Sequence, residues 1–177
     1  MEIEIIKYIQ SLHSPLFDGA MWFFTYLASF YAIILFFIIF FFFASKKYSF
    51  LFLISTLFNV GLNYILKILI NRPRPYEVSP DISNVTNSLG KSMPSGHIVT
   101  ITTIIFFLIF FLFKKLKSKL VKTILVISSI LIITLVAISR MYFGQHYVSD
   151  LVVGFVEALI ICAVELKFEQ KYNFIWH

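Results

Sequence analysis

The chain alternates between long apolar runs and short polar segments. Five runs are predominantly apolar, and most have the length of about 20 residues that a helix needs to cross the hydrocarbon of a bilayer. The third run is slightly short unless residues 94–97 form its first helical turn. We therefore predict five spanning helices, over residues 19–44, 50–70, 98–113, 120–138 and 148–165.

The segment before the first run has a different pattern. Ile3, Ile6, Ile9 and Leu12 follow one another at spacings of three, with charged and polar residues between them. This pattern is typical of a short amphipathic helix, which we expect to lie along the membrane surface and to end before the first proline. The segment lacks the basic start and the small-residue cleavage site of a removable signal peptide.

Composition supports a membrane protein. Of 177 residues, 59% are hydrophobic and only 14% are charged, whereas soluble domains carry about 25% charged residues. We predict an all-α fold, a polytopic integral membrane helix bundle that forms a single domain over residues 1–177. The single cysteine, Cys162, lies in an apolar run, so the sequence contains no disulfide framework.

The net charge of +6 would suggest nucleic acid in a soluble protein, but the placement of the cations argues against it. Five spans put two basic turns and the tail on one side, which the positive-inside rule makes cytoplasmic. Five other cations lie on the opposite side, in or beside polar segments. They could bind an anionic ligand, or they could anchor the helix ends to lipid phosphates. The first group is Lys46, Lys47, Lys114, Lys115, Lys117, Lys119, Lys122, Lys167 and Lys171, and the second is Lys67, Arg72, Arg74, Lys91 and Arg140.

The polar segment from Ser139 to Asp150 contains candidate chemistry. If a helix begins near His146, Asp150 lies one turn further on the same face and could fix the tautomer of the imidazole. The other ring nitrogen would then be free to attack or to move a proton, while Arg140 offers a planar fork of donors to an oxyanion. A hydrogen bond at a helix start explains a His and an Asp at this spacing equally well.

Two further polar segments carry complementary groups. Lys67 and Arg74, the latter on a proline-stiffened turn, can converge on one phosphate. In the sequence PSGH, Ser95 and Gly96 would open a helix toward an anion, and His97 can give a proton to a leaving oxygen. Alone, PSGH is a plain helix-start signal, but all three segments are expected on one side of the membrane.

Together these segments resemble the three motifs of the type 2 phosphatidic acid phosphatase family, membrane phosphatases related to vanadium haloperoxidases. The motifs K-x6-R-P, P-S-G-H and S-R-x5-H-x3-D are complete and in order, and residues 13–29 also look like the family's entry segment. Family members commonly have six helices, so the amphipathic segment would take the place of the first. The matching residues are Lys67, Arg74, Pro75, Pro94, Ser95, Gly96, His97, Ser139, Arg140, His146 and Asp150.

The resemblance implies a role for eight of these residues. His146 would be the nucleophile that forms a phosphohistidine, Asp150 would support its basicity, and His97 would protonate the leaving group and later activate water. The remaining five would stabilise the oxygens of the transferred phosphoryl group, and no metal or cofactor would be needed. These phosphate-binding residues are Lys67, Arg74, Ser95, Gly96 and Arg140.

We therefore expect a lipid phosphatase in a bacterial inner membrane, active at the non-cytoplasmic face on a lipid phosphomonoester or diphosphate. The motifs specify phosphate and not the tail, so phosphatidate, phosphatidylglycerophosphate and a phosphorylated lipid A stay open, with undecaprenyl diphosphate slightly favoured. A lipid phosphotransferase would use the same phosphohistidine. A non-enzymatic transporter or binding protein would have no need of both histidines, and the sequence does not indicate an oligomeric state.

One ionisable residue lies outside these motifs. Glu157 follows Asp150 by seven residues, about two helical turns deeper on the same face, while Asn59 and Asn63 precede Lys67 on the second span by eight and four residues. A carboxylate at membrane depth usually faces the interior of a bundle. We predict that Glu157 contacts Asn63 or Asn59 below the site; placement near a bent helix end or a water defect is the alternative.

Overall fold

The computed structural model describes residues 1–44, 46–86 and 89–172, and in these ranges every regular element is a helix. Ser45, from the first expected basic turn, and the side chain of Lys171 lie outside the described residues. The all-α prediction is confirmed. The helices are α1 (Glu2–Ser11), α2 (Pro15–Tyr26), α3 (Phe30–Ile39) with a π-helical turn (Phe40–Ala44), α4 (Lys46–Ile70), α5 (Pro75–Val78), α6 (Gly96–Lys115), α7 (Lys119–Tyr142) and α8 (Val148–Tyr172).

The first predicted span is not one continuous helix. It begins as α2, where Pro15 takes the first helical position and the Ser14 hydroxyl accepts a hydrogen bond from Phe17 N–H at 3.3 Å. The backbone is extended at Ser29, and α3 leaves at 56° to α2. The prediction of an unbroken span was therefore wrong.

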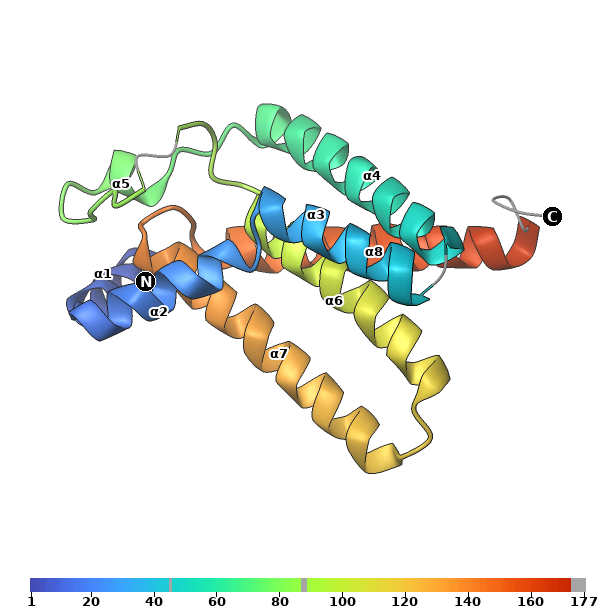
Figure 1. Cartoon of the computed structure of the whole chain (residues 1–177). Coiled ribbons are helices and arrows are strands. Elements are labelled where there is room, and N and C mark those ends of the chain that lie inside the picture. The colour runs from blue at the N-terminus through green and yellow to red at the C-terminus, as the bar shows by residue number, and fades with distance from the viewer. Residues whose placement is uncertain (45, 87–88, 173–177) are drawn as a thin grey trace.

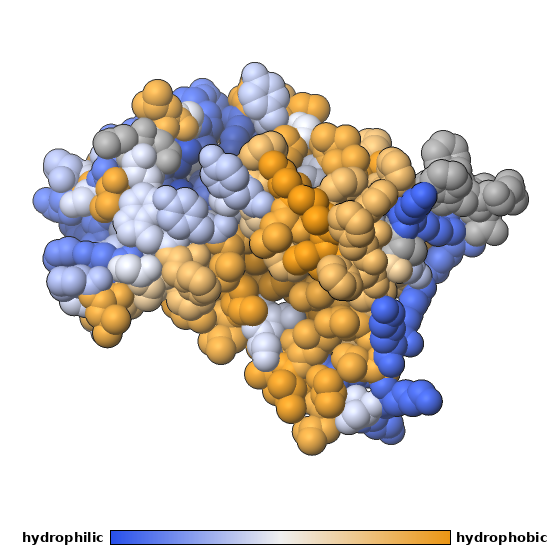
Figure 2. Space-filling model, viewed as in Figure 1, coloured by the Kyte–Doolittle hydropathy of each residue, from blue (hydrophilic) through white to orange (hydrophobic). Residues whose placement is uncertain are grey.

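Within the described ranges, α4, α6 and α7 are long and apolar enough to cross a membrane, and the bent pair of α2 and α3 makes a fourth span if it counts as one. α8 is 25 residues long, but it carries Asp150, Glu157 and Glu165 and is not among them. The predicted count of five spans is therefore not confirmed. Figure 2 shows the apolar band that these helices form between two hydrophilic ends.

The helices bring the polar segments to one end of the molecule. Figure 1 shows α1, α5 and the α7–α8 turn at that end, whereas the α6–α7 turn and the end of α8 lie at the other. α6 packs against α4, α7 and α8 and is the centre of the bundle. α7 diverges from α6, and the two helices border an apolar cavity of about 460 Å³.

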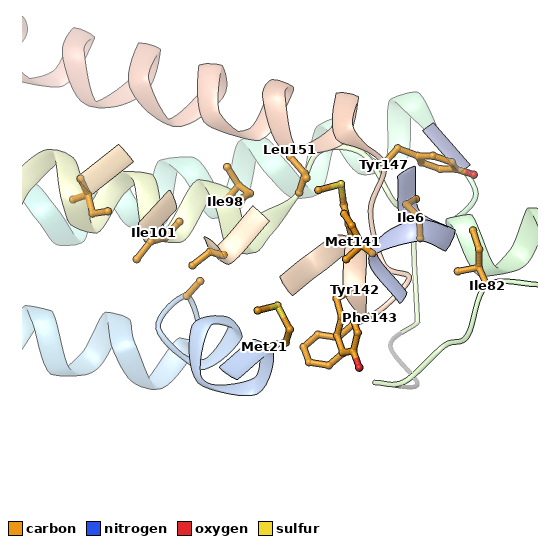
Figure 3. Packing of buried hydrophobic residues seen from close by; sticks show 14 residues of the cluster. Ile6, Met21, Ile82, Ile98, Ile101, Met141, Tyr142, Phe143, Tyr147 and Leu151 are labelled. Atoms are coloured by element: carbon orange, nitrogen blue, oxygen red, sulfur yellow. The ribbon is translucent and has the colours of Figure 1, made fainter. Parts of the chain in front are cut away.

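Two buried apolar clusters hold the bundle. One, at the polar end, includes Ile98, Met141, Phe143 and Leu151 (Figure 3), and it also contains Ile6 of α1. The apolar stripe of α1 thus faces protein, which differs from the expected contact with lipid. The other cluster, further along α4, α6 and α8, contains Cys162 together with Phe40, Phe52 and Phe107.

Candidate functional site

His146 lies in the short turn between α7 and α8 and is only 3% exposed. The turn depends on Gly144, whose φ of +69° is in the left-handed region. A Cβ atom at Gly144 would lie 2.4 Å from the carbonyl oxygen of Ser83. Gln145 N–H closes the turn with a 3.0 Å hydrogen bond to the carbonyl of Arg140. The backbone therefore fixes His146 close to the end of α7.

The tautomer of His146 is set by a backbone carbonyl. Nδ1 lies 2.7 Å from the carbonyl oxygen of Ser92 and 3.7 Å from Oδ2 of Asp150. Since a carbonyl only accepts, Nδ1 carries the proton and Nε2 is the unprotonated nitrogen. This corrects the expectation that Asp150 fixes the tautomer directly, because the carboxylate is beyond hydrogen-bond distance.

The environment of His146 favours the neutral ring. Burial lowers its pKa to about 3, against the opposing effect of Asp150, and the positive charges of Arg140, Lys67 and Arg74 lower it further. The imidazole is therefore uncharged at neutral pH, as a nucleophile must be.

Asp150 is fully buried in the first turn of α8, which begins at Val148. Its Oδ2 accepts hydrogen bonds from Tyr147 N–H, at 2.8 Å, and from the hydroxyl of Ser92. Its Oδ1 accepts one from Nη1 of Arg72 at 2.7 Å. Asp150 therefore acts on His146 in two ways, directly across 3.7 Å and through Ser92, whose carbonyl holds the imidazole.

Four consecutive carbonyls gather the cationic side chains. Those of Leu89 and Gly90 accept from Nη2 and Nε of Arg74 at 3.1 and 2.8 Å, and that of Lys91 accepts from Nζ of Lys67 at 2.8 Å. The carbonyl of Ser92 completes the row at His146. Every residue has a backbone carbonyl, so the sequence could not predict this row of acceptors. It brings Lys67, Arg74 and His146 to one place.

Two buried donors beside the row have no hydrogen-bond partner in the described part of the chain. They are Nε of Arg140 and the hydroxyl of Ser95. Arg140 is held by α2, since its Nη1 donates a 2.6 Å hydrogen bond to Oγ1 of Thr25, a residue that the sequence did not single out. A buried donor without a partner is costly, so these two atoms suit an oxyanion.

His97 lies in the first turn of α6, as predicted. It borders a cavity of about 470 Å³ between α3, α4 and α6, together with Ser29, Phe30 and Tyr64. Arg140, His146, Arg74 and Lys67 are close enough to act on its ring electrostatically. His97 thus lies between the cations Lys67, Arg74 and Arg140 on one side and the cavity bordered by α3, α4 and α6 on the other.

One glycine lets α8 approach the site closely. A Cβ atom at Gly96 would lie 3.5 Å from Oδ1 of Asn63, which is an ordinary van der Waals contact. At Gly154 it would lie 2.8 Å from the carbonyl of Ser95, whose N–H in turn donates to the carbonyl of Asp150 at 3.1 Å. Gly154 lies outside the motifs, and only the packing of α8 on the PSGH turn reveals its role.

The predicted contact of Glu157 is confirmed. Nδ2 of Asn63 donates a 3.2 Å hydrogen bond to Oε2 of Glu157, which is 6% exposed. Asn59 instead donates to Oγ1 of Thr103 at 3.2 Å. Among the described residues, no group of three or more His, Cys, Asp or Glu side chains could hold a metal ion.

The chain is similar to several known proteins. A family model described as the PAP2 superfamily matches residues 48–174. Phosphatidylglycerophosphatase B of Bacillus subtilis (strain 168) is 33% identical over 112 residues, which are 62% of this chain and 52% of that protein. The chain thus spans about half the length of this curated relative.

Two solved structures share the fold. The crystal structure of Aquifex aeolicus LpxE matches with a TM-score of 0.77 and 27% identity, covering 93% of both chains. The crystal structure of the first transmembrane PAP2 type phosphatidylglycerolphosphate phosphatase from Bacillus subtilis matches with a TM-score of 0.78 and 26% identity, covering 98% of this chain and 87% of that one.

Proposed function

Because this chain belongs to the PAP2 superfamily, we propose that it is a membrane lipid phosphatase that works through a phosphohistidine on His146. The observation that carries the proposal is the tautomer of His146. Its Nδ1 is bound to the carbonyl of Ser92, so Nε2 holds a free electron pair beside Lys67, Arg74 and Arg140. A neutral nucleophile next to three cations suits attack on a phosphate.

The reaction has two steps. Nε2 of His146 attacks phosphorus, the bond to the leaving oxygen breaks, and His97 gives that oxygen a proton. A water molecule then attacks the phosphohistidine, His97 takes a proton from it, and the N–P bond breaks to release phosphate. Arg140, Ser95 and the cations of the carbonyl row stabilise the phosphoryl oxygens, where charge gathers in the transition state. No step uses a metal ion.

The proposed substrate is a lipid phosphomonoester or diphosphate. The cavity beside His97 supports a leaving group that extends between α3 and α4, because Phe30 and Tyr64 give it apolar walls. Phosphatidylglycerophosphate is the first substrate to test, because both Bacillus subtilis relatives are named as phosphatases of this lipid. Undecaprenyl diphosphate, phosphatidate and a phosphorylated lipid A complete the panel.

The test is release of inorganic phosphate from this panel by purified protein. We expect at least one lipid to be hydrolysed, and His146→Ala to abolish release while the protein stays folded in detergent. Phosphate found on an acceptor hydroxyl would assign a phosphotransferase instead. Undiminished hydrolysis by His146→Ala would refute the mechanism.

A further inference from the structure

The N-terminal helix α1 is anchored at the site end of the bundle. Ile6 and Ile9 are buried in the apolar cluster there, and Figure 3 shows Ile6 near Met141. Gln10 adds polar contacts, since its Nε2 donates to the carbonyls of Ser83 and Tyr142 at 3.0 and 2.8 Å. These contacts hold the helix in place without its first turn.

The first turn of α1 reaches the start of α8. Oε1 of Glu2 accepts hydrogen bonds from the N–H and the hydroxyl of Ser149, at 2.8 and 2.9 Å. The N–H groups in the first turn of a helix lack partners within that helix, so Glu2 caps α8 from outside. Burial opposes ionisation of Glu2, but the hydrogen bonds from Ser149 and Arg72 outweigh it and lower the pKa.

Arg72 links this cap to Asp150. Its Nη2 donates to Oε2 of Glu2 at 3.0 Å, and its Nη1 donates to Oδ1 of Asp150 at 2.7 Å and to the hydroxyl of Ser149 at 2.6 Å. The guanidinium also lies 3.8 Å from the centre of the Tyr147 ring. This cation–π contact and the fork of donors together fix the orientation of the guanidinium. Arg72 thus occupies the side of Asp150 that faces away from Ser92.

We propose that Glu2 and Arg72 are positioning residues, which make α1 part of the active site by holding Asp150 and, through Ser92, the imidazole of His146. The proposal rests on the proposed function for its kinetic meaning. Removing Arg72 leaves one oxygen of a fully buried carboxylate without a donor. Asp150 would then shift toward its remaining donors, Tyr147 N–H and the Ser92 hydroxyl, and the Ser92 carbonyl would move with it.

Kinetics of matched variants test the link. Glu2→Ala and Arg72→Ala should each lower kcat, by up to about 100-fold, since small misplacements of reacting groups cost that much. KM should change little in both variants. Tm should change little in Glu2→Ala, because Ile6, Ile9 and Gln10 still hold α1. Arg72→Ala should also lower Tm, because it leaves an oxygen of the buried Asp150 without a donor. Glu2→Gln, which keeps an acceptor for Ser149, should recover part of the rate. Glu4→Ala is the control, since the Glu4 side chain is 73% exposed and its ion pair with Lys7 spans 3.7 Å.

The double variant distinguishes a positioning role from a purely structural one. The double variant Glu2→Ala, Arg72→Ala should be no slower than Arg72→Ala, since both substitutions break one chain of contacts. Additive losses of kcat, a loss of kcat in Glu2→Ala that only follows a loss of Tm, or an unchanged kcat in either single variant would overturn the proposal.

A spectroscopic readout separates this proposal from the proposed function. In ¹⁵N-histidine-labelled protein, with His146→Gln assigning the signal, the Nδ1-protonated form of His146 should dominate in wild type and Glu4→Ala. Arg72→Ala should show mixed tautomers, and an unchanged spectrum would refute the link even if no lipid proves to be a substrate. Failure of the wild type to release phosphate would refute only the proposed function.

Discussion

Asn63 of α4 and Glu157 of α8 share a buried 3.2 Å hydrogen bond. Lys67 lies one turn from Asn63 on α4, and Asp150 lies two turns from Glu157 on α8. The bond therefore joins the two helices that carry opposite sides of the site. A buried polar pair is costly to break, so it helps to fix the separation of the helices.

Replacing Glu157 tests this joint. Glu157→Gln should be mild, because an amide oxygen can still accept from Asn63. Glu157→Leu should destabilise the protein by about 1–3 kcal/mol and slow turnover, since it leaves a buried amide unpaired. Tm and phosphate release measure both effects, with Val156→Leu on the exposed side of α8 as control. A stable and fully active Leu variant would contradict the role.

Gly154→Ala should reduce activity strongly. Its Cβ would lie 2.8 Å from the Ser95 carbonyl, so either α8 or the PSGH turn must move. Gly61→Ala is the matched control: a Cβ at Gly61 meets nothing within 4 Å, and alanine is favoured over glycine within a helix by about 0.5–1 kcal/mol. Equal activity of the two variants, measured as kcat/KM, would show that the close approach is unimportant.

Activity should survive chelation and be blocked by vanadate. The proposed mechanism uses only side chains, and a trigonal bipyramidal vanadate adduct of His146 would imitate phosphoryl transfer. Phosphate release in the presence of EDTA, and inhibition by orthovanadate, are the measurements. Activity that EDTA removes and magnesium restores would refute the metal-free mechanism.

Acid should destabilise the protein through His146. Its pKa is about 3 when folded and near 6.5 when unfolded, so the unfolded chain binds an extra proton as the pH falls below 6.5. Stability is then lost at a rate on the order of 1 kcal/mol per pH unit. Tm measured from pH 7 to 5 should fall more steeply in wild type than in His146→Gln. Parallel curves would contradict the assignment.

Cysteine labelling tests the orientation in the membrane. Lys91→Cys should react with an impermeant thiol reagent in intact cells, whereas Lys117→Cys should not, because the basic turn is expected to be cytoplasmic. The native Cys162 is buried and gives little background. Labelling at position 117 alone would show that the protein has the opposite orientation to the one predicted.

The sequence predicted α4, α6, α7 and α8 well because each coincides with a long apolar run. It missed the break between α2 and α3, since residues 27–29 contain neither proline nor glycine. The break lies where Thr25 binds Arg140 of α7, a tertiary contact with no local signal.

The motif residues were found from the sequence because their side chains carry the chemistry. Their partners were missed for a physical reason. The carbonyls of residues 89–92 can belong to any residue type, and Arg72 occupies a position of the first motif that the motif leaves unspecified. Glu157 could be paired with Asn63 because helical periodicity alone places both on inward faces.

The close approach at Gly154 also has a use in searching for related sequences. A methyl group would not fit between α8 and the Ser95 carbonyl, so a protein with this helix register must have glycine four positions after the motif aspartate. The third motif can thus be written S-R-x5-H-x3-D-x3-G. Sequences that fit the shorter pattern but carry a larger residue at its new end would mark relatives in which the eighth helix is set at a different depth or distance.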